Sequence, residues 1–257
     1  MVHNHIGEIT GGFKTKAGRI DTKGLIEKIE SGYIAHTKSG FKVKKSFSPS
    51  SLVYGHGACP RYWFFAFSGA DYVDDVTPWQ AANMRSGTFS HERIQQAIGD
   101  SGILIENETK MTYDNPPMLG YRDSLVMWNG EEVAVEIKTC NDNSFEARKN
   151  SRKALPYHIE QLLMYMRIGG QKIGVIIYEN KNTHELLAIP VEMDAEYEEW
   201  LDKLFAWMET VYSAWEAGEL PKKKYRSNSK VCAACPLKNH CDYQDAFGVD
   251  IPVLEHL

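Results

Sequence analysis

Two short motifs and the turn between them constrain the fold of this chain more than any other feature. Gly120-Tyr-Arg-Asp123 and Glu136-Ile-Lys138 each lie in a strand-like run, and Asn129-Gly130 separates the two runs. An Asn-Gly pair between such runs is the strongest short-range signal for a hairpin with a two-residue turn. Because side chains alternate along a strand, the glutamate and the lysine share one face, and the hairpin carries the aspartate to the neighbouring strand.

Two carboxylates and an ammonium group that converge at a strand end need an explanation. Buried charges are costly unless each has a partner. A metal ion and an anionic substrate supply such partners, whereas hydrophobic packing does not. The motifs therefore indicate a metal-assisted site, on the condition that the hairpin register places Asp123 and Glu136 on the same face.

The length and composition of the chain are those of a globular protein. Its 257 residues, 43% hydrophobic and 25% charged, suit one large domain or a domain with an extension. No apolar run approaches the roughly 20 residues that span a bilayer, and the first residues lack a signal-peptide pattern. We therefore expect a cytoplasmic protein without a membrane partner. The net charge of -5 does not itself indicate a nucleic-acid partner, although local basic runs can provide one.

The order of periodic segments predicts an α/β fold with a mixed sheet flanked by helices. Helices are expected over residues 79–98, 155–168 and 195–217, and strands over 103–112, 118–127, 133–139, 172–178 and 186–191. The polar and basic stretch 141–152 between them is expected to be mobile.

Residues 1–47 are expected to form an N-terminal extension, with a short helix at 21–29 and a hairpin over 32–47. Its lysines are expected to form a solvated face, with DNA contact as the alternative; they are Lys38, Lys42, Lys44 and Lys45. A domain over residues 48–257 then begins with a helix that has Ser48 as N-cap and Pro49 at its first position.

Four of the five cysteines are candidate metal ligands. Cys232, Cys235 and Cys241 have the C-x2-C-x5-C spacing of metal ligands and need a fourth thiolate. Cys59 is the candidate, because Pro60 breaks or kinks the first helix there, before residues 62–65. Four thiolates suit either a 4Fe-4S cluster or tetrahedral zinc, and the spacing does not decide between them. The remaining cysteine, Cys140, is expected to be a buried or half-buried free thiol without a role, and His240 is an alternative ligand beside Cys241.

The helix predicted over residues 155–168 has two faces. An apolar stripe follows i, i+3, i+4, i+7 spacing and consists of Ile159, Leu162, Leu163 and Met166. His158, Gln161 and Tyr165 share a second face, which is either a polar surface or part of the site.

In their order along the chain, these motifs resemble the RecB-like branch of the PD-(D/E)XK nucleases. The resemblance is closest to its iron–sulfur members, which include CRISPR-associated RecB-like exonucleases, AddB-type nuclease domains and phage relatives. It covers about residues 48–241 and rests on a series of motifs in the family's order. The series begins with the first-cysteine helix from Ser48 to Arg61 and ends with the three C-terminal cysteines. Between them lie the histidine motif Gly87-Thr-Phe-Ser-His91-Glu92, the aspartate motif Gly120-Tyr-Arg-Asp123, the E-x-K motif Glu136-Ile-Lys138 and the Q-x3-Y motif Gln161-Leu-Leu-Met-Tyr165.

The resemblance implies a restriction-endonuclease-like core and a Mg2+- or Mn2+-dependent DNA exonuclease that prefers single-stranded ends. It implies roles in recombination, repair, phage DNA processing or CRISPR adaptation, in the cytoplasm of a cell or of a phage host. The implied metal ligands are His91, Asp123, Glu136 and the carbonyl of Ile137. Lys138 would then orient the attacking water or stabilise phosphate charge, and Gln161 and Tyr165 would position the nucleophile or the DNA. The resemblance favours an iron–sulfur cluster over zinc, joining the first helix to the C-terminal tail.

Two basic runs are expected to follow the DNA backbone. They consist of Arg148, Lys149 and Arg152, and of Lys222, Lys223 and Lys224. The aromatic residues at 62–67 are expected to pack in the core, with stacking on single-stranded bases as the alternative. Two other hypotheses remain open: a non-catalytic module that binds DNA or a recombination or CRISPR protein partner, and a zinc-stabilised nuclease domain.

Overall fold

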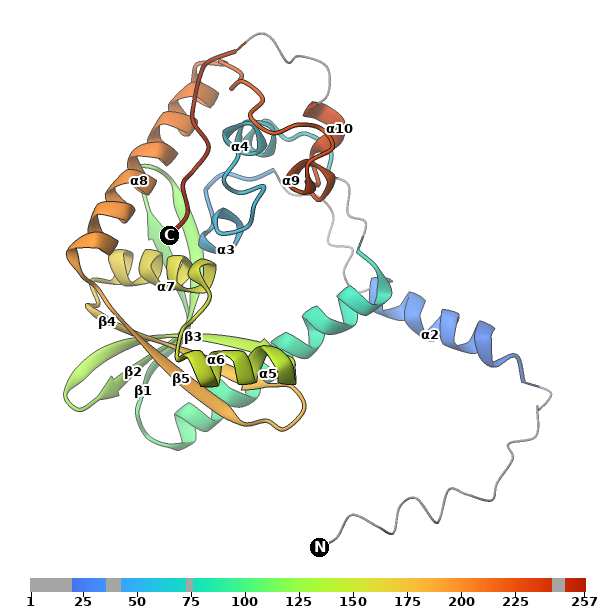
Figure 1. The fold of residues 1–257 in the computed structure, drawn as a ribbon, viewed down its shortest axis with the longest axis vertical. Helices are drawn as coiled ribbons and strands as arrows, with labels where there is room; N and C mark the ends of the chain where they lie inside the picture. Colours follow the sequence, from blue (N-terminus) through green and yellow to red (C-terminus); the bar gives the residue numbers. More distant parts are fainter. Residues whose placement is uncertain (1–19, 36–42, 73–75, 242–247) are drawn as a thin grey trace, which may run out of the picture. The chain divides into compact units, whose positions relative to one another are not determined.

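The computed structural model describes residues 20–35, 43–72, 76–241 and 248–257 (Figure 1). Helix α2 (Thr22–Ala35) and residues 76–83 form one unit, and the other described residues form a second unit. Helix α2 is longer than the helix expected at 21–29, and it occupies residues 32–35, where a hairpin was expected. That hairpin prediction is wrong there, and residues 36–42 lie outside the described residues.

The second unit is built on one five-stranded mixed sheet, as predicted. Its strands are β1 (Leu104–Tyr113), β2 (Met118–Trp128), β3 (Glu131–Cys140), β4 (Ile173–Asn180) and β5 (Leu186–Glu192), in the order β1-β2-β3-β4-β5. Strands β3 and β4 are parallel, and the other neighbours are antiparallel. A parallel pair needs a long crossover, and α6 (Asp142–Ser151) and α7 (Pro156–Gly169) supply it.

The turn between β2 and β3 is the two-residue hairpin that Asn-Gly predicted. Trp128 pairs with Glu131, and the two turn residues have positive φ angles, 52° at Asn129 and 86° at Gly130. Positive φ at both positions is the requirement of a type I′ turn, which asparagine and glycine tolerate best. The turn therefore fixes the register that links the two motifs.

The two faces of the sheet bury different sets of side chains. On one face, Ile94 and Ile98 of α5 (Pro78–Asp100) pack against a cluster with Val135 and Ile137 of β3. On the other face, Ala134 of β3 packs in the larger core, which includes Leu162, Leu163 and Met166 of α7. Alternation along β3 then sends Glu136 and Lys138 toward the α7 side.

Helix α7 is buried on both of its predicted faces. Gln161 and Tyr165 are buried, and so is Glu160 between the two faces. A polar surface face, one of the two alternatives, is therefore ruled out for these side chains. The third member of that face, His158, is partly buried and contacts the Tyr178 hydroxyl at 2.7 Å.

Two further elements close the core. Helix α8 (Ala195–Glu216) packs its tryptophans against the C-terminal segment, where Trp200 donates to the carbonyl of Glu255 and Trp207 to that of Pro252. Figure 1 shows this segment running back beside α8. Among the described residues, no helix combines the length and apolar character needed to cross a bilayer.

The first helix of the domain is shorter than predicted. It ends at Leu52 as α3 (Pro49–Leu52), and a second helix, α4 (Pro60–Phe67), starts after a loop with Cys59 as its N-cap. The break at Cys59 is confirmed. Proline has no N–H group to donate and its ring fixes φ, so it is well placed to begin a helix and poorly placed to continue one.

Three other local expectations are resolved. The stretch 141–152 was expected to be mobile but forms α6, because Asn141 caps it by accepting from the Ser144 N–H and Phe145 is buried beneath it. Most aromatic side chains at 62–67 are buried, as core packing predicts.

Lys44 was expected on a solvated face, but it is half-buried, with its Nζ 5.5 Å from the centroid of the Trp63 ring. The other N-terminal lysines are divided: Lys45 is exposed, and Lys38 and Lys42 lie outside the described residues.

The close approach of α7 to β4 depends on Gly174. A Cβ atom at this position would lie 2.7 Å from the Met166 sulfur and 2.9 Å from a Leu162 methyl carbon. We expect Gly174→Ala to lower the free energy of unfolding by about 1–3 kcal/mol, as overpacking does in other cores. Urea denaturation followed by circular dichroism measures this.

Gly87→Ala is the matched control, because Gly87 lies in α5 with nothing within 4 Å of its added Cβ. Alanine there should leave stability unchanged or raise it by up to about 1 kcal/mol. Equal unfolding midpoints for Gly174→Ala and the wild type would contradict the tight contact.

Candidate active site

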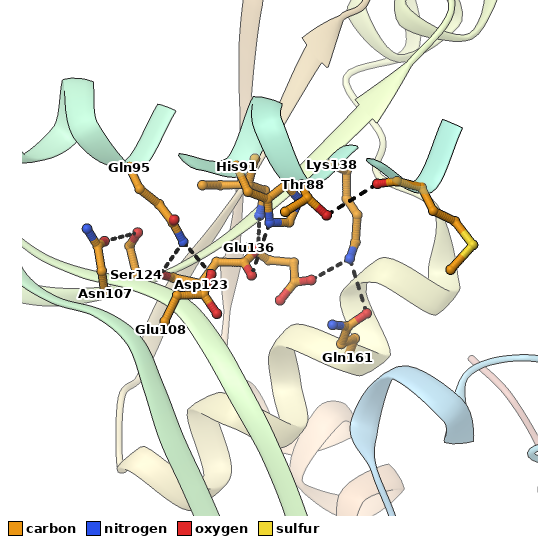
Figure 2. A network of polar contacts seen from close by, with 12 residues as sticks. Thr88, His91, Gln95, Asn107, Glu108, Asp123, Ser124, Glu136, Lys138 and Gln161 are labelled. Atoms are coloured by element: carbon orange, nitrogen blue, oxygen red, sulfur yellow. Dashed lines mark hydrogen bonds and ion pairs between the residues drawn. The ribbon is translucent and has the colours of Figure 1, made fainter. Parts of the chain in front are cut away.

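The acidic residues of the two motifs meet where β2 and β3 separate. The last recorded pair between these strands is Ser124 with Val135, so Asp123 and Glu136 follow directly at the point of separation. The backbone N–H of Ile137 donates to Asp123 Oδ2 at 2.6 Å. Figure 2 shows the two carboxylates beside one another. The register therefore meets the condition that the sequence left open.

Helix α5 supplies the next layer of contacts. His91 Nδ1 lies 3.4 Å from Asp123 Oδ1. Gln95, one turn further along, donates from Nε2 to the Asp123 carbonyl at 2.9 Å and to Glu108 Oε1 at 2.7 Å (Figure 2). These two side chains hold Asp123 from the face opposite α7.

Glu108 of β1 is a candidate ligand that the sequence analysis missed. His91, Glu108 and Asp123 each offer one possible ligand atom, and these atoms all lie within 4.8 Å of one another. Glu108 has a φ of 47°, in a region that non-glycine residues seldom adopt, and such residues cluster at functional sites. The sequence does place an acidic residue in the strand predicted next to that of Asp123. It does not predict the backbone conformation that directs the Glu108 side chain toward His91 and Asp123.

Lys138 joins Glu136 to α7. Its Nζ donates to Glu136 Oε1 and, at 3.2 Å, to Gln161 Oε1 (Figure 2). Glu136 is only 1% exposed. Its second oxygen, Oε2, is buried and has no hydrogen-bond partner among the described residues.

The electrostatics of the site reflect this crowding. Burial raises the pKa of Glu136 well above its usual range, the charge of Asp123 raises it further, and Lys138 opposes the shift. Burial lowers the pKa of His91, but the hydrogen bond and charge of Asp123 outweigh it, so the net shift is upward. The shift of Glu136 thus reflects mainly its burial, and that of His91 reflects the negative charge of Asp123.

A divalent cation fits this site by two observations. The unpartnered Glu136 Oε2 is the kind of buried atom that a bound ion satisfies. Carboxylate oxygens with one imidazole are also a donor set suited to Mn2+ and, through the oxygens, to Mg2+. The ligands proposed from sequence are thus brought together in part. His91 contacts Asp123, and Glu136 lies beside Asp123 (Figure 2). For Ile137, the contact with Asp123 is made by its N–H group, whereas its carbonyl was the expected ligand.

Tyr165 supports the site from within the protein. A Cβ atom on Gly120 would lie 2.6 Å from the Tyr165 hydroxyl, so only glycine allows this approach. The hydroxyl interacts with the backbone at Tyr121 and with Gln161. Burial raises its pKa, and the charges of Glu136 and Asp123 add to the effect. Tyr165 is therefore placed to position Gln161 and the Asp123 strand.

The four predicted cysteine ligands line one cavity of about 260 Å³. Cys232 belongs to α9 (Lys230–Ala233) and Cys241 to α10 (Lys238–Cys241), and Cys59 reaches them from the start of α4. Burial raises the pKa of Cys235 to about 11, and the neighbouring thiols add to the shift. His240 instead contacts the Asp71 carbonyl at 3.1 Å. Cys140 is half-buried, as expected.

The basic residues predicted to bind DNA lie in different environments. Lys149 Nζ lies 2.7 Å from Glu185 Oε1, and Lys222 and Lys224 both pair with Asp250. Lys223 donates to Ser227 and lines the cysteine cavity, and Arg152 is the exposed C-cap of α6. The charge of Arg148 acts to lower the pKa of Tyr157 and of His158, and the charge of Lys138 acts to lower the pKa of the same two residues.

The fold has counterparts among solved structures. A structure of LHK-Exo in complex with dAMP matches with a TM-score of 0.52 and 16% sequence identity, over 67% of this chain and 89% of that one. The chain shares the fold of LHK-Exo. A second LHK-Exo structure, described as an alkaline exonuclease from Laribacter hongkongensis, has a TM-score of 0.47 and 17% identity over 73% and 91% of the two chains. SSO0001 has a TM-score of 0.47 and 15% identity over 85% and 96%. The sequence itself matches no protein-family model and no curated protein.

His158 gives the site region a pH-dependent stability. Burial, together with the charges of Lys138 and Arg148, lowers its pKa from 6.5 to about 3. Between these values the unfolded chain binds a proton that the folded chain does not, so stability falls as the pH is lowered. His158 should contribute up to about 1.4 kcal/mol per pH unit to the slope of the free energy of unfolding against pH. We expect His158→Gln to remove this contribution, as measured by urea denaturation between about pH 7 and pH 5.

Tyr178→Phe serves as the control, because it removes the hydroxyl that contacts His158 but keeps the buried imidazole. That variant should retain the slope. An identical pH dependence for wild type and His158→Gln would contradict a neutral, buried His158.

Proposed function

We propose that this protein is a metal-dependent deoxyribonuclease of the PD-(D/E)XK type, carried by residues 48–257, that removes nucleotides from DNA ends and prefers single strands. The supporting observation is the convergence of Asp123, Glu136 and Lys138 where two strands separate. The LHK-Exo structure with the same fold contains dAMP, a DNA nucleotide. Recombination, repair, phage DNA processing and CRISPR adaptation are the settings in which such an activity is used.

Asp123 and Glu136, with His91 and Glu108 beside them, would hold Mg2+ or Mn2+. When bound, the metal lowers the pKa of a water molecule and neutralises charge on the scissile phosphate. The Ile137 N–H holds one carboxylate oxygen of Asp123, and Gln95 holds its backbone carbonyl, so the position of this side chain is restricted. Such fixed ligands reduce the reorganisation that the reaction requires.

Lys138 has the second role in this proposal. It lies between Glu136 and Gln161, so its ammonium group is held by two acceptors and remains close to the acidic pair. From there it orients the attacking water or stabilises the negative charge that develops on the phosphate. Gln161, supported by Tyr165, sets the position of Lys138.

We further propose that the four cysteines hold a 4Fe-4S cluster. In tetrahedral zinc sites with Zn–S bonds near 2.3 Å, the sulfurs lie about 3.8 Å apart. No three of these four sulfurs, all in the described part of the chain, lie within 4.8 Å of one another. This wider spacing and the 260 Å³ cavity favour a larger metal group than a single zinc ion.

The cluster would close a loop of 173 residues (232 minus 59). Closing a flexible loop of that length costs roughly 4–5 kcal/mol of chain entropy by the logarithmic rule. Ligand binding offsets this cost only while the metal group is present. The cysteines are therefore proposed as a clamp between α4 and the C-terminal helices, not as part of the reaction.

A nuclease assay with matched variants tests the catalytic proposal. We expect Glu136→Gln and Lys138→Ala each to lower the rate of DNA degradation by about 10²–10⁴-fold, because each removes a group that acts on the reacting phosphate or water. Removal of divalent metal with EDTA should abolish the activity, and Mg2+ or Mn2+ should restore it. End-labelled single and double strands measure strand preference in the same experiment.

Glu131→Gln is the control, since Glu131 is an exposed acid at the other end of the same strand. It should retain wild-type activity, and circular dichroism should show all variants folded. If both site variants degrade DNA as fast as the wild type, the site is wrong. DNA retention without degradation in the wild type would favour the non-catalytic binding module.

Anaerobic purification tests the cysteine proposal. We expect the broad visible absorbance of an iron–sulfur cluster and about four iron atoms per chain, whereas zinc is colourless. Cys241→Ser should lose the colour and lower the thermal unfolding temperature. Cys140→Ser, a half-buried cysteine outside the cavity, should keep both. A colourless protein with one zinc per chain would reject the iron–sulfur assignment.

A further inference from the structure

Two exposed tyrosines stand beside the candidate active site without a role in it. Tyr54 lies in the loop between α3 and α4 and is 57% exposed. Tyr157 is near the start of α7 and is 36% exposed. Their ring centroids are 6.5 Å apart and the rings are inclined by 32°, so they form one surface from two separate elements. We call them the tyrosine pair.

The backbone beneath the tyrosine pair is held firmly. The Tyr54 carbonyl accepts from the Gly57 N–H at 2.7 Å, and the His56 ring stacks 6.5 Å from the Tyr54 ring at an angle of 17°. Gly57 approaches α3 so closely that a Cβ atom would lie 1.8 Å from the Ser51 carbonyl oxygen. The His158 ring lies against Tyr157 at 4.3 Å. Rigid aromatic side chains lose little entropy when a ligand binds.

The tyrosine pair adjoins the groups that would handle phosphate. Lys138 interacts electrostatically with Tyr54 and with Tyr157. Arg148 is close enough for its charge to act on Tyr157 as well. Tyr157 lies one helical turn before Gln161, which accepts from Lys138 Nζ, so the tyrosine pair is within electrostatic range of two cations. One of these cations, Lys138, contacts Glu136. A polyanion with flat apolar groups is the ligand class that this combination fits.

We propose that Tyr54 and Tyr157 are a stacking platform for an unpaired nucleobase at the end of the DNA strand whose phosphate lies at Lys138. This inference rests on the proposed function and makes it more specific, because it defines the substrate as a strand end with a free base. A base can stack on the platform only after it leaves the duplex stack. Stacking does not depend on base identity, so the platform accepts all sequences.

Most of the aromatic residues at 62–67, for which stacking on bases was the alternative to core packing, are not available for this role, and Phe64 and Phe65 are half-buried. Tyr62, Trp63 and Phe67 are buried in the core. The tyrosine pair was not found from sequence because Tyr54 and Tyr157 are 103 positions apart (157 minus 54) and come together only through the packing of α3 against α7.

Equilibrium binding to labelled oligothymidylate tests the platform. An oligonucleotide of about 12 nucleotides suits the roughly 4–16 nucleotides that single-strand sites cover, and Ca2+ replaces Mg2+ or Mn2+ so that binding is measured without turnover. We expect Tyr54→Ala and Tyr157→Ala each to weaken binding roughly 5- to 100-fold, the range that one stacked base contributes. Phenylalanine at either position should keep most of the affinity.

An oligonucleotide with abasic nucleotides at both ends provides the decisive comparison. The wild type should bind it more weakly by a similar factor, whereas the Tyr54→Ala/Tyr157→Ala double variant should bind both oligonucleotides equally. Trp128→Ala is the control, because Trp128 is 58% exposed but lies at the β2–β3 turn, away from the site. It should bind as the wild type does.

The results of these experiments distinguish a failure of the stacking proposal from a failure of the nuclease proposal. Unchanged affinity in the alanine variants, or an equal abasic effect in the wild type and the double variant, overturns the platform while Glu136→Gln still tests the nuclease. Binding that depends on the tyrosines in a wild type that never degrades DNA supports the platform and rejects the nuclease. A protein that neither binds nor degrades DNA overturns both.

Discussion

The burial of Glu136 is the constraint on which the rest of the site depends. A carboxylate with 1% exposure needs compensation, and one oxygen obtains it from Lys138 while the other has no partner among the described residues. Burial raises the pKa of Glu136, and the negative charge of the neighbouring Asp123 raises it further. A divalent cation between the two carboxylates would offset both effects. A structure that only needed stability would replace this arrangement with apolar side chains.

Much of the site could be predicted because its central part is local in sequence. The Asn129-Gly130 turn fixes the register of β2 and β3, and that register alone places Asp123 beside Glu136. Spacing on a helix likewise indicated that Gln161 and Tyr165 share a face. The resemblance to a nuclease family added the expected metal and substrate, and the fold is shared with LHK-Exo.

The features that sequence did not indicate depend on non-local packing or on backbone conformation. Glu108 lies in a strand but has a positive φ angle, and its side chain lies close to His91 and Asp123. Glutamate seldom adopts this conformation, and no sequence pattern predicts it. Helix α6 buries a single apolar side chain, Phe145, and so lacks the apolar stripe by which a helix is predicted from sequence. The tyrosine pair exists only because α3 packs against α7.

The connection between β3 and β4 has a consequence for the order of assembly. The hairpin that unites Asp123 and Glu136 closes over a two-residue turn, whereas α7 and β4 come later in the chain, after α6, and pack against the hairpin from a greater sequence distance. Local contacts form sooner than distant ones. We therefore expect a nascent chain to hold the two carboxylates together before Gln161 arrives. In that interval their repulsion opposes folding, and a divalent cation in the surroundings would act as a folding aid before it serves any reaction.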